Sequence, residues 1–350
     1  MTTVTVNTSK KYDVLIGDGL LQNIGSYVKQ VKANCKIALI SDSNVWPLYG
    51  ETVKNDLTAV GFDVVEYIFP AGEASKNIET YFEIVNFLAE NHVTRSDALV
   101  ALGGGVVGDI TGFAAATYLR GISYIQVPTT LLSMVDSSVG GKTAIDLPMG
   151  KNLIGAFNQP VLVICDCSTL SSLPDKYFID GCAEVIKYGV LFDAELFAHL
   201  ECYGLSFDRN YVISRCVALK RDIVEDDEFD TGIRQKLNLG HTIGHSVEAI
   251  SNFALSHGNG VAIGMAIIAR AAAAAKICDV LSCERLVSVL EKFMLPSNTD
   301  HSVELIVSNS LSDKKRAGNY INLIVPKEIG NCLIMKVPVA ELNAFLEPGL

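Results

Sequence analysis

The chain has 350 residues, of which 49% are hydrophobic and 19% charged, and its formal net charge is −11. This length suggests two domains, and the hydrophobic content indicates a well-buried globular protein rather than a disordered one. The negative charge argues against general nucleic-acid binding, whose affinity comes largely from Lys and Arg contacts to phosphates.

The N-terminal residues, the apolar runs and the cysteine pattern together indicate where the protein is expected to reside. Apolar runs stay below the roughly 18 residues that a membrane-spanning helix needs, and the first residues, Met-Thr-Thr-Val-Thr-Val, lack a basic and apolar signal region. The nine cysteines are widely scattered apart from Cys165 and Cys167. This pattern fits reduced thiols rather than a disulfide framework. We therefore expect a cytoplasmic protein that does not span a membrane.

The first half of the chain alternates short apolar runs with helical patterns, which is typical of parallel βαβ units. Helical patterns lie between the apolar runs, for example Ile78–Asn91 and Val106–Tyr118. The expected strands are Tyr12–Ile16, Lys36–Ser41, Asp63–Phe69, Ala98–Leu102, Ser123–Val127 and Val161–Cys165.

After Leu170 the pattern becomes mostly helical, with one late hairpin formed by Tyr320–Val325 and Cys332–Val337. We predict a Rossmann-like α/β domain over residues 1–168 and a mostly α-helical domain over residues 169–350. The expected helices are Pro174–Gly189, Asp193–Tyr203, Asn210–Glu225, His241–Asn252, Gly258–Cys278 and Glu284–Phe293.

A glycine-rich turn follows the fourth expected strand, where Leu102 leads into Gly103-Gly-Gly105-Val-Val-Gly108-Asp109 and then a helix. Strand, glycine turn and helix N-terminus together can bind a phosphate through backbone N–H groups and the helix dipole. The spacing satisfies G-x-G-x-x-G, although a tight structural turn would have the same spacing.

Two other strand ends carry polar residues that suit the same ligand. Asp42 follows the second strand, where a carboxylate could bind a ribose hydroxyl, and Pro70-Ala-Gly72-Glu73-Ala-Ser-Lys76 follows the third. Because dinucleotides bind at the carboxyl ends of parallel strands, the three strand ends together favour a dinucleotide site.

Basic residues between glycines form the next cluster, with Gly140-Gly-Lys142-Thr143 and Gly150-Lys151-Asn152. A P-loop is rejected because Asp136 stands where its first glycine is required. These residues could bind a phosphate or carboxylate group, or form a solvated loop. Further basic residues follow at Lys187, Lys220, Arg221, Arg234, Lys314, Lys315 and Arg316.

Three of the six histidines fall within seventeen residues, in His241-Thr-Ile-Gly-His245 and at His257. Residues four apart share one helix face, so His241 and His245 could both bind a metal, with Glu184 as a further ligand. Such a pair also occurs as an ordinary helix face or a satisfied core pair. Lys187 lies one turn after Glu184, on the same face.

Taken together and in order, these motifs closely resemble the 3-dehydroquinate synthase family over nearly the whole chain. The most specific stretch is Gly150-Lys-Asn-Leu-Ile-Gly-Ala-Phe-Asn-Gln-Pro160. The other stretches are Gly103–Asp109, Pro128–Thr130, Gly140–Asp146, Ala183–Gly189, Asn238–His245 and His257–Met265.

The resemblance implies a metal site of zinc or cobalt with Glu184, His241 and His257 as ligands, and His245 beside it as a substrate-binding or proton-handling residue. It therefore replaces the His241 and His245 ligand pair suggested by spacing alone. It also implies a site for NAD+, made by Asp42, Glu73, Lys76, Gly104, Gly105, Val106, Asp109, Thr129, Thr130, Lys142, Lys151, Thr169 and Ser172.

The implied reaction converts 3-deoxy-D-arabino-heptulosonate 7-phosphate to 3-dehydroquinate and phosphate. The C5 hydroxyl is oxidised by NAD+, phosphate is lost by β-elimination, the ketone is reduced again, and an aldol closure follows. The departing phosphate itself could serve as the base. The resemblance assigns Lys220 and Arg234 to the substrate carboxylate and Asp136 and Lys187 to the ring hydroxyls. It assigns Lys142, Asn152, Asn238, His245, Lys314 and Arg120 to the phosphate end, with Lys151 as a further substrate-binding residue.

The resemblance also implies a homodimer in which Arg120 reaches the phosphate site of the neighbouring subunit. Departures from the family pattern occur at Ser246, where Ala is usual, and at Asn259-Gly260, where Glu-Ala is expected. The alternatives are another sugar-phosphate cyclase, a metal-dependent polyol dehydrogenase and a non-catalytic binding protein of the same fold. Lys220 and Arg234 favour the synthase, because a neutral sugar phosphate has no carboxylate to bind.

Overall fold

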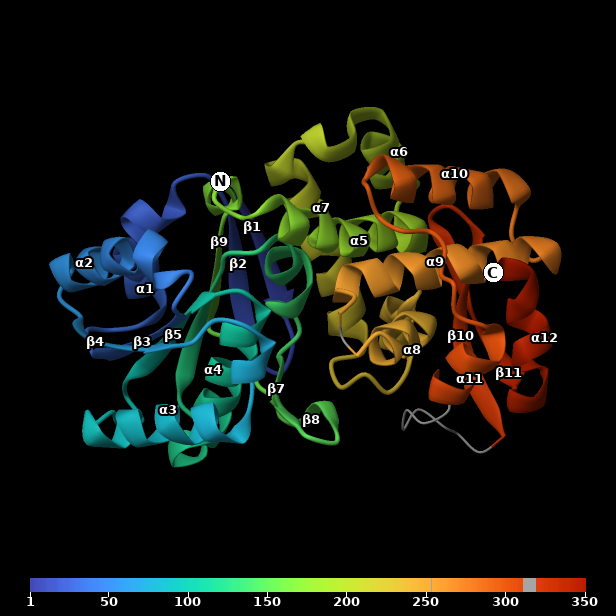
Figure 1. The fold of residues 1–350 in the computed structure, drawn as a ribbon. Coiled ribbons are helices and arrows are strands. Elements are labelled where there is room, and N and C mark those ends of the chain that lie inside the picture. The colour runs from blue at the N-terminus through green and yellow to red at the C-terminus, as the bar shows by residue number, and fades with distance from the viewer. Residues whose placement is uncertain (253, 311–318) are drawn as a thin grey trace. The chain divides into compact units, whose positions relative to one another are not determined.

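The structure, a computed structural model, describes residues 1–252, 254–310 and 319–350. The chain forms two compact units (Figure 1). The first unit consists of Met1–Leu173 and Arg209–Phe229, and the second consists of Pro174–Asp208 and Asp230–Leu350.

A seven-stranded sheet forms the centre of the first unit, with the strand order β1-β2-β9-β6-β5-β3-β4. Every neighbouring pair is parallel except β1 and β2. β5 is buried over its whole length, as expected for an apolar strand covered on both faces. The strands are β1 Thr2–Asn7, β2 Lys11–Gly17, β3 Lys36–Asp42, β4 Asp63–Phe69, β5 Ala98–Gly103, β6 Ser123–Pro128 and β9 Leu162–Asp166.

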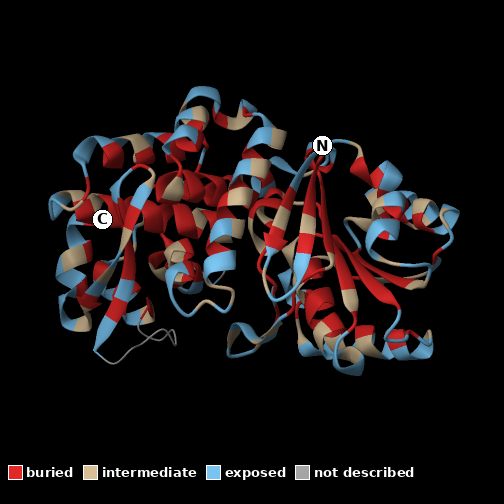
Figure 2. Cartoon of the chain, turned by 180° about the vertical axis from the view of Figure 1, so that it is seen from behind, coloured by how far each residue is buried: buried red, intermediate tan, exposed pale blue. Residues whose placement is uncertain are grey.

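Helices cover both faces of this sheet, and buried residues follow its strands in Figure 2. On one face Val28 and Leu57 pack against strand residues such as Leu39, and on the other Ile84 and Ile110 pack in the same way. The covering helices are α1 Ile24–Val31 and α2 Glu51–Ala59 on the first face and α3 Ile78–Glu90 and α4 Gly105–Thr117 on the second.

Two further parts complete the first unit. An antiparallel hairpin of β7 (Lys142–Leu147) and β8 (Gly150–Phe157) packs on α4. Helix α7 (Arg209–Asp226) returns to this unit after the chain has entered the second, and it packs against β1, β2 and the short helix Ser133–Ser137. The buried side of α7 includes Val212, Cys216 and Val217, which explains why the helix stays with the sheet.

The second unit is built around α9 (His257–Ala274), which contacts α5, α8, α10, α12 and β10. Its apolar residues are buried almost all round, which accounts for a sequence that is hydrophobic on every face. The remaining elements are α5 Asp175–Phe192, α6 Ala194–Tyr203, α8 His241–Ile250, α10 Val280–Lys292, α11 Val303–Ser310, α12 Leu342–Leu346 and the hairpin of β10 Tyr320–Glu328 with β11 Asn331–Pro338.

The predicted fold class, an α/β region followed by a mostly helical region, is confirmed. The expected division into residues 1–168 and 169–350 differs from the two units, because 209–229 packs with the sheet and the first break falls after Leu173. The sequence patterns also missed β1 and the β7–β8 hairpin. For the hairpin, the glycines and lysines had suggested a loop. The missed strands lie at a sheet edge or outside the main sheet.

The nine cysteines are all free thiols, and seven of them are buried; Cys202 is exposed and Cys35 is half-buried. Burial raises the pKa of the Cys167 thiol to about 12 and that of Cys278 to about 11. Among the described residues, no helix is long and apolar enough to cross a membrane.

Candidate active site

Three helices of the second unit bring one carboxylate and two imidazoles together. Glu184 of α5 is fully buried, and its Oε1 lies 3.4 Å from Nε2 of His241 at the start of α8 and 3.4 Å from Nε2 of His257 at the start of α9. The ligand atoms of these three residues all lie within 4.8 Å of one another. Each helix therefore contributes one side chain to a single compact set.

Glycines allow the three helices to come this close. A Cβ on Gly240, which precedes α8 with φ +80°, would lie 2.5 Å from the carbonyl oxygen of Val261 in α9. A Cβ on Gly258 would lie 2.0 Å from the carbonyl oxygen of Asp180 in α5. Any side chain at either position would force the backbones apart, and the imidazoles would move with them.

The surroundings act on the two imidazoles in opposite directions. The Nδ1 of His241 lies 3.1 Å from the carbonyl oxygen of Leu239, and burial, followed by the neighbouring charge of Lys187, holds the pKa of His241 well below its usual value. Burial works to lower the pKa of His257 as well, but hydrogen bonds with Glu184 and Glu248 raise it to about 10 in the metal-free protein. A cation bound here would have to displace that proton.

The donor set matches a known class of metal site. Two imidazoles and one carboxylate are the protein ligands of several catalytic zinc sites, which leave a further position open. A buried carboxylate with one oxygen 3.4 Å from each of two imidazole nitrogens provides that chemistry in this structure. The three residues therefore fit a divalent zinc or cobalt ion.

His245 lies beside this set rather than within it. Its ring centroid is 5.3 Å from that of His241 and 5.8 Å from that of His257. It groups instead with Glu248 and His257 in a second, overlapping set of possible ligands. The i,i+4 spacing put His241 and His245 on one face of α8, but it could not distinguish the two sets.

Lys187 and Arg234 are both buried in the second unit. Lys187 is one turn after Glu184 on α5, and its ammonium forms an ion pair with that carboxylate. Arg234 and Asn238 lie on the short helix Ile233–Asn238, which leads through Leu239 and Gly240 into α8. Lys314 lies outside the described residues.

In the first unit, the glycine loop joins β5 directly to α4. Gly104 is the residue before the helix, so no side chain caps the first N–H groups of α4. A Cβ on Gly104 would lie 3.1 Å from Thr130, and one on Gly105 would lie 3.3 Å from the hydroxyl of Ser137. The loop therefore presents backbone N–H groups at a helix N-terminus, which suits a phosphate. Val106 is in the first turn of α4, and the N–H of Thr129 donates to the carbonyl oxygen of Gly103.

A charged network stands next to this loop. The buried ammonium of Lys76 donates to Asp109 Oδ2 at 2.6 Å and to Asn152 Oδ1 at 2.5 Å. Nearby, Lys151 and Glu73 form a longer ion pair of 3.7 Å. The structure thus brings together four residues assigned to the cofactor, namely Glu73, Lys76, Asp109 and Lys151, and one assigned to the phosphate, Asn152. They come from the segment before α3, from α4 and from β8.

The remaining predicted residues of the first unit lie in three places. Asp42 Oδ1 accepts hydrogen bonds from the N–H groups of Asn44 and Val45, so it also caps the turn after β3. The hydroxyl of Tyr49 links the carbonyl oxygen of Thr169 to the hydroxyl of Ser172. Lys142 is exposed at the start of β7, and Arg120 is exposed after α4.

Asp136 and Lys220 are direct partners in the first unit. The Lys220 ammonium on α7 donates to Asp136 Oδ1 at 2.5 Å and to the carbonyl oxygen of Asp136 at 2.6 Å. Sequence reasoning had assigned Lys220 to the helical domain, and the return of α7 to the sheet corrects that assignment.

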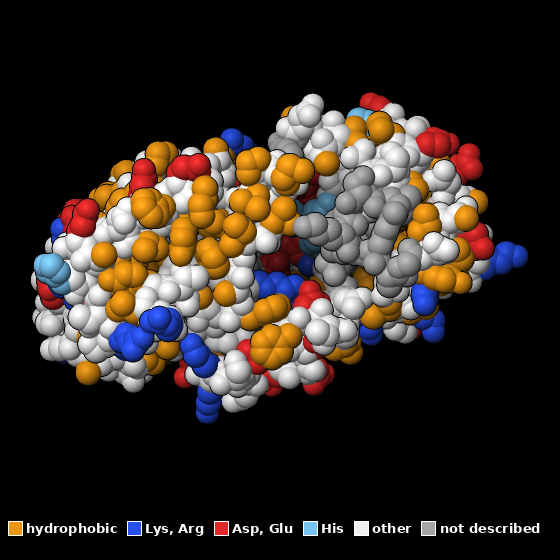
Figure 3. Space-filling model, turned by 90° about the horizontal axis from the view of Figure 1, so that it is seen from below, with side chains coloured by type: hydrophobic (Ala, Val, Ile, Leu, Met, Phe, Trp, Pro, Cys, Tyr) orange, Lys and Arg blue, Asp and Glu red, His pale blue; other side chains and the backbone are white. Residues whose placement is uncertain are grey.

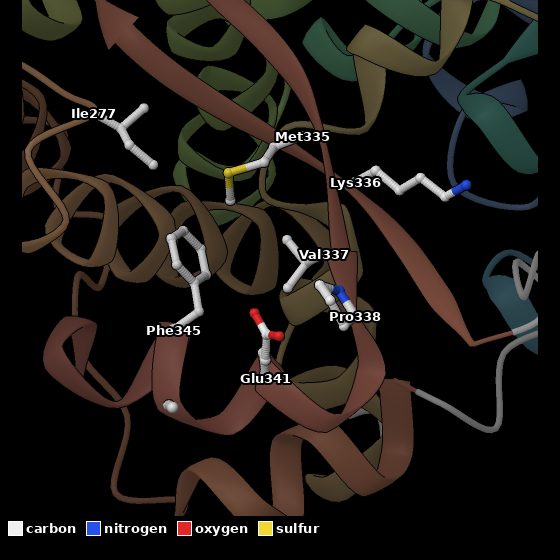
Figure 4. Close-up of a pocket in the computed structure, with 8 residues that line it drawn as sticks. Ile277, Met335, Lys336, Val337, Pro338, Glu341 and Phe345 are labelled. Atoms are coloured by element: carbon white, nitrogen blue, oxygen red, sulfur yellow. The ribbon is translucent and has the colours of Figure 1, made fainter.

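Sequence reasoning missed Glu248, whose Oε1 lies 3.1 Å from Nδ1 of His257. Its spacing of seven residues from His241 and three from His245 would have placed it on the same helix face. It also missed Asp180, which accepts a hydrogen bond from the N–H of Asn259 at 3.2 Å. A separate cavity of about 380 Å³ beside β11 and α12 contains none of these residues (Figure 4).

Comparison with known proteins identifies the family. Residues 66–180 match the family model for the N-terminal part of 3-dehydroquinate synthase, and residues 181–316 match the model for its C-terminal part. The chain belongs to the 3-dehydroquinate synthase family. The 3-dehydroquinate synthase of Clostridium acetobutylicum is 45% identical, and the alignment covers 96% of each chain. The family and the enzymatic function expected from the motifs are thus confirmed.

Solved structures of other cyclases share the fold. The 2-epi-5-epi-valiolone synthase of Streptomyces hygroscopicus, with NAD+ and Zn2+ bound, has a TM-score of 0.89 at 27% identity, covering 99% of this chain and 98% of its own. A 2-deoxy-scyllo-inosose synthase complexed with carbaglucose-6-phosphate, NAD+ and Co2+ has a TM-score of 0.89 at 24% identity, covering both chains completely. At 24% identity, this second match supports the fold alone.

Proposed function

We propose that this chain converts 3-deoxy-D-arabino-heptulosonate 7-phosphate to 3-dehydroquinate and phosphate, using NAD+ and a zinc or cobalt ion. Its membership of the 3-dehydroquinate synthase family supports this proposal. The observation that carries the chemistry is the buried Glu184 carboxylate with two imidazole Nε2 atoms 3.4 Å from one of its oxygens.

The metal would be held by Glu184, His241 and His257. When bound, the metal would polarise the hydroxyl that is oxidised, and NAD+ would take up and return the hydride. Lys187, which is paired with Glu184, would hydrogen-bond a substrate hydroxyl next to the metal. His245, which is close to both metal-binding histidines, would bind the substrate and handle its proton.

The NAD+ site would use the N-terminus of α4 for the pyrophosphate, with Gly104 and Gly105 allowing close backbone approach. Lys76 and Asp109 would orient the cofactor through the charged network beside the loop. The residues that would line the rest of the site are Asp42, Glu73, Val106, Thr129, Thr130, Lys142, Lys151, Thr169 and Ser172.

The substrate would be held at its two charged ends. Lys220 and Arg234 would bind the carboxylate, and Lys220 would then share its ammonium between that carboxylate and Asp136. Asp136 would in turn accept from a ring hydroxyl. The phosphate would be bound by Lys142, Lys151, Asn152, Asn238, His245 and Lys314, together with Arg120 of a second copy.

We also propose that the protein acts as a homodimer in the cytoplasm, where its scattered thiols would stay reduced. Hydrophobic side chains gather on the face of the first unit seen in Figure 3. The exposed apolar residues of α3, of the short turn after α4 and of the β7–β8 hairpin are Ile78, Phe82, Leu119, Met149, Leu153 and Phe157. Arg120 directly follows Leu119, so pairing of this face with a second copy would carry the arginine into the interface.

One experiment separates the proposed reaction from its alternatives. Purified protein is mixed with NAD+, zinc and the heptulosonate phosphate, and released phosphate and reduced nicotinamide are both followed. We expect continuous phosphate release, a requirement for only catalytic NAD+, and no accumulation of NADH. NADH that accumulates in step with product would identify a polyol dehydrogenase. Phosphate release only from a neutral sugar phosphate would identify another cyclase.

A further inference from the structure

Glu248 makes a contact with His257 that none of the assigned roles uses. It is a buried residue of α8, and its Oε1 lies 3.1 Å from the Nδ1 atom of His257. The opposite nitrogen of the same ring, Nε2, faces Glu184 Oε1 at 3.4 Å. The imidazole of His257 is therefore held between two carboxylates, one on each side.

We infer that Glu248 is the positioning residue of His257, and that it fixes which nitrogen of this ring is offered to the metal. A carboxylate that accepts a hydrogen from Nδ1 leaves the lone pair on Nε2, the atom that faces Glu184. The inference rests on the proposed metal set of Glu184, His241 and His257. Glu248 acts on the metal only through His257.

The two histidines of the set are held in different ways. The Nδ1 atom of His241 faces a backbone carbonyl oxygen, that of Leu239 at 3.1 Å, which no side-chain substitution removes. The Nδ1 atom of His257 faces a side chain from another helix. His257 is also the more exposed of the two rings, so its orientation depends more on this one partner.

Glu248 is also a member of the second set, with His245 and His257, so it could instead be a ligand itself. The geometry favours the positioning role. Both sets need His257, but the set with Glu184 uses its Nε2 and leaves Nδ1 for Glu248. Ligation on the Nδ1 side of His257 would leave the metal away from Glu184 Oε1, the atom that lies 3.4 Å from the Nε2 atoms of both His241 and His257.

Gly260 makes room for this arrangement in α9. A Cβ at this position would lie 2.9 Å from Cγ of Glu248, 3.0 Å from its Oε1 and 3.0 Å from the carbonyl oxygen of Gly244. At the other departure, Asn259, the backbone N–H donates to Asp180 Oδ1 at 3.2 Å. The departure from the family pattern at Gly260 thus leaves space for the Glu248 carboxylate.

The test compares the zinc affinities of the purified wild type, Glu248→Ala, Glu248→Gln and His257→Ala, measured by competition with a chromogenic chelator. Glutamine keeps an acceptor for Nδ1–H and removes only the charge. We expect Glu248→Ala to bind zinc about 10- to 100-fold more weakly. Glu248→Gln should recover most of that loss, and His257→Ala should not bind stoichiometrically. The visible spectrum of the cobalt-loaded protein should shift in Glu248→Ala and return towards the wild-type spectrum in Glu248→Gln.

Ser246→Ala is the matched control, because Ser246 is a buried polar residue of the same helix whose hydroxyl donates to the carbonyl oxygen of Thr242 at 3.2 Å. Its zinc affinity should equal that of the wild type. Equal affinity in Glu248→Ala and the wild type would overturn the inference, and so would complete loss in both Glu248 variants, which would make Glu248 a ligand. If the wild type itself bound no zinc, the proposed metal set would fail instead.

Discussion

The glycine loop of the first unit and the metal cluster of the second are made from different parts of the chain. The loop offers backbone N–H groups at the start of α4, next to a network of charged side chains. The cluster offers one side chain from each of three helices, held together by glycines at the helix crossings. Backbone N–H groups remain in place when any one side chain is removed, whereas a metal site with three side-chain ligands loses a third of its ligands. Substitutions in the second unit should therefore be the more damaging.

The largest expected effect is in the metal cluster. His257→Ala should lose both bound metal and activity, because it removes one of the three proposed ligands. His245→Ala should lose activity and keep its metal, since His245 lies outside the Glu184 set. Elemental analysis of the two purified variants, alongside an activity assay, measures both quantities. Stoichiometric zinc in His257→Ala would show that the ligand assignment is wrong.

The next prediction concerns whether one active site uses residues of two subunits. Arg120→Ala and Lys187→Ala homodimers should each be nearly inactive, because each lacks one proposed substrate contact. When the two variants are unfolded together and refolded, each mixed dimer should contain one intact site if Arg120 acts in the neighbouring subunit. Random mixing should then restore roughly a quarter of wild-type activity. Mixed dimers that form without activity would place Arg120 in the site of its own subunit.

A smaller effect is expected in the first unit, where the backbone N–H groups of the glycine loop remain. Asp109→Ala should raise the concentration of NAD+ needed for half-maximal activity by roughly 10- to 150-fold, the equivalent of one charge-assisted hydrogen bond of about 1.5–3 kcal/mol. It should also destabilise the protein, because it leaves the buried Lys76 ammonium without its carboxylate partner. Asp109→Asn is the isosteric control, which removes the charge but keeps the volume. If both variants kept their fold but lost all activity at saturating NAD+, the glycine-loop site would be as sensitive to a single substitution as the metal cluster, and the prediction would be wrong.

The smallest effect concerns Gly260. The closest contact of the added Cβ in Gly260→Ala would be Cγ of Glu248 at 2.9 Å, in a side chain that can shift, whereas the backbone carbonyl oxygen of Gly244 at 3.0 Å would have to move only slightly. Zinc affinity should therefore fall by less than the roughly 10-fold lower bound expected when such a partner is removed. Chelator competition on this variant and on Ser246→Ala measures the difference. A loss as large as that of Glu248→Ala would mean that the methyl group separates α8 from α9.

The sequence predicted the sheet well because buried parallel strands are short apolar runs ended by Gly, Asp and Lys. The strand of Ala98–Leu102 and the glycine turn after it lie where the pattern put them. β7 and β8 carry a different signal, since Lys142, Gly150 and Lys151 interrupt their apolar positions and Asn152 has a positive φ of 56°. Pattern reading took that interruption for a loop.

The proposed metal cluster was harder to predict from spacing because its proposed ligands come from three helices. The four-residue spacing showed that His241 and His245 share a face, but the choice of His257 depends on how α9 crosses α8. The same limit hid Glu248, since its contact is with a residue of another helix. Only a tertiary contact distinguishes a ligand from its neighbour on the same helix face.

The return of α7 to the first unit has a consequence for how the protein is made. The sheet of this unit is complete in sequence by β9, yet the helix that packs against β1 and β2 ends only at Asp226. A ribosome adding about 5–20 residues per second needs roughly 3 to 11 seconds to pass from residue 173 to residue 229. During that interval the nascent first unit exposes the surface that Val212, Cys216 and Val217 later cover. A fragment cut after Leu173 would keep that surface exposed, and it should aggregate unless α7 is supplied as a separate peptide.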